Sequence, residues 1–122
     1  MTDAEITWLS PDTVQLRQPK SSHWEAPFLF LLFGRERALL IDTGATGDEQ
    51  VFPLRGTVDA LTDTWLRRNP AVFTRPYPLA VAHSHAHRDH IAGDALLAGR
   101  PGTTVVGTTP AQVIAFFGFR SW

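Results

Sequence analysis

Short apolar runs alternate with polar positions along the first forty residues and predict a meander of strands. The runs around Ile6 and Val14 are separated by the turn-forming residues Ser10-Pro11-Asp12. Two longer apolar runs flank Gly34-Arg35-Glu36, which is the spacing of a β-hairpin. The expected strands are residues 6–9, 14–17, 28–33 and 37–41.

The rest of the chain alternates between helical and strand patterns. Leu54, Val58, Leu61 and Trp65 recur at helical intervals, and Asn69-Pro70 ends that helix after the basic last turn at Arg67-Arg68. Further elements are expected as a strand at 78–82, a helix at 88–97 ending at Gly99, a strand at 103–107 and a last helix. Thr109, Pro110 and Gln112 form the N-cap, first position and capping box of that helix. This order predicts an α/β layered fold in a single domain over residues 1–122.

Four of the five histidines lie between positions 83 and 90, in the run His-Ser-His-Ala-His-Arg-Asp-His. Imidazole and carboxylate groups are the usual protein ligands of zinc and similar cations. In an extended turn His85 and His87 point the same way, and Asp89 and His90 follow from a neighbouring direction. One short loop could thus offer two ligands to each of two metals. A His-rich tract can also be a solvated segment that binds metal incidentally. The apolar strand before the tract and the glycine after it favour a built site, with His83 as a strand-end residue and not a ligand.

The segment resembles the His-x-His-x-Asp-His signature of the metallo-β-lactamase superfamily, matched by His85, His87, Asp89 and His90. The apolar residues 78–82 precede it, and Ile91-Ala92-Gly93 stands where the family usually has Ile-Gly-Gly. Upstream, residues 38–44 look like the family's strand that ends in Asp-Thr-Gly. Two ordered motifs about forty residues apart are a specific signal.

The resemblance implies the N-terminal half of the superfamily's αββα sandwich. It implies His85 and His87 on a first metal, Asp89 and His90 on a second, and Asp42 as a carboxylate that braces the metal loop; an ordinary turn is the alternative for Asp42. Zinc is the expected metal, up to two ions in a complete domain, with iron or manganese as alternatives. The implied activity is hydrolysis: a metal-bound hydroxide would attack an ester, thioester, lactone or amide carbonyl of a small-molecule substrate, with Asp89 as the catalytic carboxylate.

The family takes further histidine and aspartate ligands from later strands, but no histidine follows His90 here and the only later carboxylate is Asp94. The chain is therefore expected to be incomplete, and the aromatic residues near Trp122 are expected to mediate self-association or to pack against a C-terminal complement. The alternative function is a catalytically silent, truncated or partial metal-binding domain that needs such a partner.

Composition narrows the other possibilities. The chain has 122 residues, 43% of them hydrophobic, and a net charge of -1, so a nucleic-acid partner is not expected. It has no cysteine, which leaves nitrogen and oxygen as metal ligands. No signal peptide and no membrane-length apolar run is visible, so a cytoplasmic location without membrane contact is expected.

Overall fold

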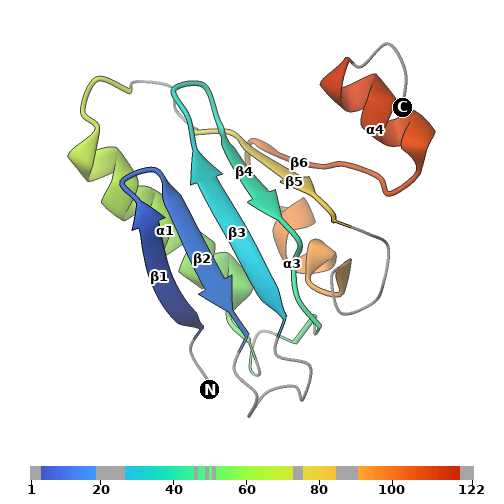
Figure 1. The fold of residues 1–122 in the computed structure, drawn as a ribbon, viewed down its shortest axis with the longest axis horizontal. Coiled ribbons are helices and arrows are strands. Elements are labelled where there is room, and N and C mark those ends of the chain that lie inside the picture. The colour runs from blue at the N-terminus through green and yellow to red at the C-terminus, as the bar shows by residue number, and fades with distance from the viewer. Residues whose placement is uncertain are drawn as a thin grey trace.

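The computed structural model describes residues 4–18, 27–45, 47–48, 50, 52–72, 76–84 and 91–118. Its strands form one sheet in the order β1-β2-β3-β4-β5-β6 (Figure 1). Their bounds are β1 Glu5–Ser10, β2 Thr13–Arg17, β3 Phe28–Phe33, β4 Ala38–Ile41, β5 Leu79–Ala82 and β6 Thr103–Val105. All six expected strands are present, each within one or two residues of its predicted ends.

The sheet changes from antiparallel to parallel pairing at β4. Strands β1 to β4 pair antiparallel in chain order, as the predicted meander requires. Strand β4 then pairs parallel with β5, with Leu40 opposite Val81, and β5 pairs parallel with β6. The carboxyl ends of β4 and β5 therefore lie side by side at one edge of the sheet. These are the two strands that lead into the Asp-Thr-Gly and histidine motifs.

One face of the sheet packs on α1 (Leu54–Arg68) and α3 (Asp94–Ala98), which lie behind it in Figure 1. The core side chains of the strands alternate with exposed ones, as in β3, where Leu29, Leu31 and Phe33 are buried. The predicted apolar stripe of α1 is buried against them. Trp65 stacks on Phe33 at 5.1 Å between ring centroids. These contacts fix the sheet on its helices.

The helix expected over residues 88–97 is interrupted in the structure: Ile91 is helical, residues 92 and 93 form a turn, and α3 begins at Asp94. The backbone N–H of Ala92 donates to the carbonyl of Gly44 at 3.1 Å and so does not continue a helix. A turn covers residues 92–93 and lets this segment pack on the exit of β4. The expected helical positions 88–90 lie outside the described residues.

Helix α4 (Pro110–Phe117) begins as predicted. The Thr109 side chain accepts from the backbone N–H of Gln112, and the Gln112 side chain accepts from the backbone N–H of Thr109. Arg37 lies over the ring of Phe116, 5.5 Å from its centroid. Phe117 is 39% exposed, so the aromatic end of this helix is only partly covered within the described residues.

The second face of the sheet carries a continuous apolar strip. Strand register places Phe30 beside Ile41 and Leu32 beside Leu39, all on the side away from α1. Each of these residues keeps part of its surface exposed, and Phe28 is 45% exposed. We call this strip, made of Phe28, Phe30, Leu32, Leu39 and Ile41, the open face.

No helix in the described parts of the chain is long and apolar enough to cross a membrane.

Candidate metal centre

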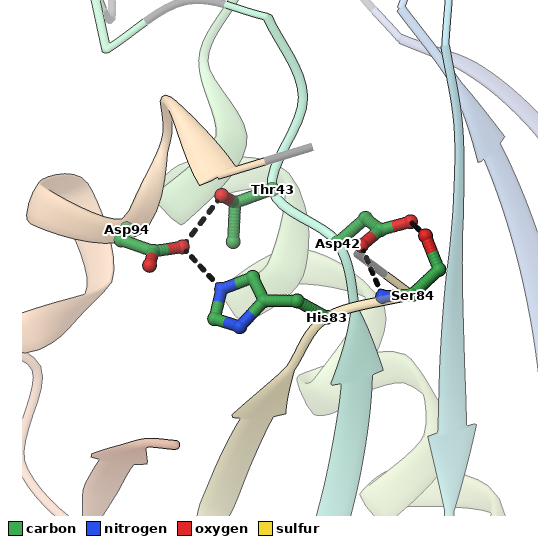
Figure 2. Close-up of polar contacts among 5 residues, drawn as sticks. All are labelled: Asp42, Thr43, His83, Ser84 and Asp94. Carbon is green, nitrogen blue, oxygen red and sulfur yellow. Dashed lines mark hydrogen bonds and ion pairs between the residues drawn. The ribbon is translucent and has the colours of Figure 1, made fainter. Parts of the chain in front are cut away.

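Asp42 joins the ends of the two parallel strands that lead into the motifs. It follows β4 directly, and its backbone N–H donates to the carbonyl of Ala82 at 2.8 Å. Its carboxylate accepts from the Ser84 backbone N–H at 2.8 Å and from the Ser84 hydroxyl at 2.6 Å (Figure 2). Hydrogen bonds to a charged acceptor are stronger than neutral ones, and Asp42 is only 4% exposed. The residue immediately before His85 is therefore held at a fixed position.

Asp42 has a left-handed backbone conformation, with φ at 69°. Aspartate and asparagine tolerate this region better than most residues do. The conformation turns the chain sharply after β4 and leaves the carboxylate facing the end of β5. The Asp-Thr-Gly segment thus gives both a turn and a buried acceptor.

A second polar cluster lies beside the first and contains His83, Asp94 and Thr43 (Figure 2). The Nε2 atom of His83 lies 2.9 Å from Oδ1 of Asp94, and the Thr43 hydroxyl donates to the same oxygen at 2.7 Å. The His83 side chain is 2% exposed and that of Asp94 is 29% exposed. His83 was expected to be a strand-end residue near the site, and it does follow β5 directly.

The segment after the histidine motif is packed tightly on the exit of β4. A Cβ atom at Gly93 would lie 2.3 Å from the carbonyl oxygen of Thr43 and 2.8 Å from a methyl carbon of Leu54. These distances are shorter than real contacts, so only glycine fits this approach. Together with the hydrogen bond between Ala92 and Gly44, this contact fixes the position of the residues that follow the histidine motif.

Gln18 supports the Asp-Thr-Gly turn from β2. Its side chain is fully buried, and its Oε1 atom accepts from the backbone N–H of Ala45 at 2.9 Å. Gln18 was not among the residues predicted from the sequence. A signal was present, because Gln18 continues the two-residue alternation of the buried Val14 and Leu16. The roles of Ser84 and Asp94 were missed as well, since their partners are distant in sequence or lie beyond an unexpected turn.

The four expected ligands, His85, His87, Asp89 and His90, lie outside the described residues. Among the residues that the structure does describe, no group of three or more His, Asp or Glu side chains is arranged to hold a metal. The structure therefore describes the two flanks of the motif and their anchors. The ligand set itself stays a prediction.

Several solved structures that resemble this chain are metallo-β-lactamases. The enzyme from Pontibacter korlensis aligns with a TM-score of 0.56 at 22% identity, over 98% of this chain and 49% of that one. The enzyme from Hirschia baltica gives 0.56 at 18% identity, over 96% and 48%. The enzyme from Erythrobacter litoralis gives 0.54 at 19% identity, over 93% and 45%.

These comparisons define the fold. The chain has the α/β fold of the N-terminal portion of a metallo-β-lactamase domain, and it spans about half the length of the structures it matches. The fold predicted from the two sequence motifs is thereby confirmed. No family model matches the sequence, and no curated protein matches it.

Proposed function

We propose that this chain carries the metal-binding half of a metal-dependent hydrolase site, with His85, His87, Asp89 and His90 as ligands. One observation carries the proposal: Asp42 fixes Ser84, the residue before the first expected ligand, at the shared edge of β4 and β5. A buried carboxylate in that place supports the residues that flank a metal site. The likeness to metallo-β-lactamases supports the same location for the site.

The available donor atoms fit a divalent cation of intermediate softness. The proposed ligands offer three imidazoles and one carboxylate, and the sequence has no cysteine. Zinc is the metal we propose, while iron and manganese accept the same nitrogen and oxygen ligands. His85 and His87 would share one ion, and Asp89 and His90 a second.

The bound cation would act as a Lewis acid that polarises a substrate carbonyl and acidifies a water molecule. The contribution of the protein is to hold ligands and protons in place. Asp42 would keep the start of the motif oriented through Ser84, and Asp89 would combine ligation with handling of a proton from the attacking water. The proposed substrate class is a small molecule with an ester, thioester, lactone or amide carbonyl.

The open face bears on where the rest of the site comes from. Its apolar strip faces away from α1 and α3 and would be covered by a second sheet in a layered sandwich. We propose that a C-terminal complement supplies this layer, and that self-association covers the face when the complement is absent. The histidine and aspartate ligands that this chain lacks after His90 would come with that layer.

The proposal is tested by turnover in the natural gene product that contains this sequence. Asp89→Asn should reduce metal-dependent hydrolysis by on the order of a hundredfold or more, since the substitution removes a charged ligand and a proton acceptor. Asp59→Asn is the matched control, because Asp59 lies on α1 and pairs with Arg100. Equal, near-normal turnover in both variants, or hydrolysis that survives complete removal of metal, would contradict the proposal.

A further inference from the structure

The contact between His83 and Asp94 connects two positions that lie on opposite sides of the histidine motif. His83 follows β5 and precedes the first expected ligand, while Asp94 is the first residue of α3. The expected ligands at positions 85–90 lie between them in sequence. The 2.9 Å contact therefore closes the chain around the motif (Figure 2).

The polarity of this contact follows from the groups that surround it. The Asp94 oxygen already accepts from the Thr43 hydroxyl, so a carboxylate acceptor and an Nε2–H donor satisfy both partners. The Nδ1 atom of His83 is buried and has no hydrogen-bond partner among the described residues. Burying Nδ1 as an unpaired acceptor costs less free energy than burying it as an unpaired N–H donor. This again assigns the proton to Nε2.

The cluster is anchored independently of the motif. Thr43 is fully buried at the exit of β4, and its carbonyl packs against Gly93. Asp94 therefore connects three segments of the chain. It contacts the end of β4 through Thr43 and the end of β5 through His83, and it is itself the first residue of α3. Asp42 holds the exit of β5 at a separate point, through Ser84.

We infer that His83 and Asp94 are positioning residues that tie the two ends of the His-x-His-x-Asp-His segment and so preorganise its ligands for metal. The inference rests on the proposed function for its metal-binding consequence. Its structural part, the tie itself, stands on the contacts given above. Closing a short segment at both ends reduces the conformations that its ligands must give up on binding.

The size of the effect can be predicted from supporting residues at other metal sites. Loss of a hydrogen-bond partner beside the ligands typically weakens metal binding by about 10–100-fold. His83→Leu and Asp94→Ala should each show such a loss for Co²⁺. His83→Gln can still donate an amide N–H toward Asp94 and should restore most of the affinity. Asp94→Asn keeps the oxygen acceptor without its charge and should be intermediate.

The experiment uses the full chain and Co²⁺ alone, with affinity measured by titration of the visible cobalt spectrum. A second measurement, made without metal, is the hydrogen-exchange rate of the Ser84 and Ala92 amides, which bond to Asp42 and Gly44. Both amides should exchange faster in His83→Leu and Asp94→Ala than in the wild type. The Trp65 amide in α1 is the internal reference. Asp59→Ala is the control, because it removes a comparable 2.7 Å bond to Arg100 outside the tie.

The possible outcomes separate the inference from the proposed function. Folded variants with unchanged exchange at Ser84 and Ala92 would overturn the tie. Faster exchange with unchanged cobalt affinity would overturn its role in positioning the ligands. A wild-type chain that binds no cobalt would refute the proposed metal site, while the exchange rates would still decide whether the tie exists. If the removal variants do not fold, Asp94→Asn alone carries the test, with the same two readouts.

Discussion

Asp42 and Ser84 are 42 positions apart in sequence and are joined by two hydrogen bonds, of 2.8 and 2.6 Å, to one buried carboxylate. This relationship locks the exits of two parallel strands together. It also explains why an acidic residue stands in the left-handed turn after β4, where glycine would satisfy the backbone equally well. The carboxylate is needed for Ser84, and the geometry of the turn is needed to aim it.

Replacing Asp42 should therefore separate the contribution of its carboxylate from that of its left-handed backbone conformation. Asp42→Ala leaves the Ser84 amide without its acceptor and should lower the free energy of unfolding by about 1–3 kcal/mol. The left-handed backbone adds about 1 kcal/mol for alanine. Asp42→Asn tolerates the backbone and keeps one acceptor oxygen, so its loss should be smaller. Urea unfolding of the three proteins checks the order, and an asparagine variant less stable than the alanine variant would contradict it.

Two glycines that flank α3 provide a paired prediction. Gly93→Ala would force a Cβ atom against the Thr43 carbonyl and should destabilise the protein by about 1–3 kcal/mol, as overpacking does. Gly99 has open space around the same position and an ordinary φ of -86°, so Gly99→Ala should be neutral or slightly stabilising. Thermal unfolding of both variants measures the difference. Equal stabilities would show that the segment at Gly93 can shift away.

Ionisation of Tyr77 should lower the stability of the folded protein at alkaline pH. Burial raises the pKa of its hydroxyl above the ordinary value of 10.0, and the nearby charge of Asp12 acts in the same direction, although the hydrogen bond with Gly34 lowers it. The folded state thus holds the proton more tightly than the unfolded state. The stability that this gives is complete below about pH 10 and is lost as the pH rises through the folded pKa.

The Tyr77 effect is measurable because Tyr77 is the single tyrosine of the sequence. Its tyrosinate absorbance reports the folded pKa directly, and the free energy of unfolding can be followed over the same alkaline range. Tyr77→Phe should be less stable at neutral pH by about 0.5–1.5 kcal/mol, because it loses the bonds to Gly34. It should also show a weaker alkaline decline. The same decline in both proteins would assign it to other groups.

The sequence predicted the elements better than it predicted their partners. Apolar runs and turn residues identified β2 and β3, helical spacing identified the buried stripe of α1, and Thr109 with Gln112 gave the start of α4. These signals are local, since each depends on neighbours within a few positions. The site anchors are not local. Ser84 finds Asp42 only because β4 and β5 pair in parallel, and no sequence pattern encodes that register.

The helix expected at 88–97 shows the same limit in another form. The prediction was correct from Asp94 onward, but Gly93 was treated as an ordinary helical position. In the structure the close approach of Gly93 to Thr43 replaces helical continuity. The consequence is functional as well as structural, because the turn at residues 92–93 directs Asp94 toward His83. This contact depends on tertiary packing, so the spacing of the two residues alone could not reveal it.

The open face predicts association of the isolated chain. Burying an exposed phenylalanine or leucine side chain contributes about 1.5–3 kcal/mol, and several lie together on this face. Sedimentation should show dimers or larger species, and Phe28→Lys should reduce them. Ile6→Lys is the control, because Ile6 is also 45% exposed but lies on the other side of the sheet, opposite Leu16. A monodisperse wild-type monomer would contradict the prediction.

Metal binding by the histidine motif can be measured by calorimetric titration of zinc into the full chain. The wild-type chain should bind zinc, and His85→Ala with His87→Ala should abolish binding of the ion that this pair holds, because the pair supplies the ligands of that ion. The stability of the double variant without metal should be close to that of the wild type. Zinc affinity that is unchanged in the double variant would contradict the assignment of the site.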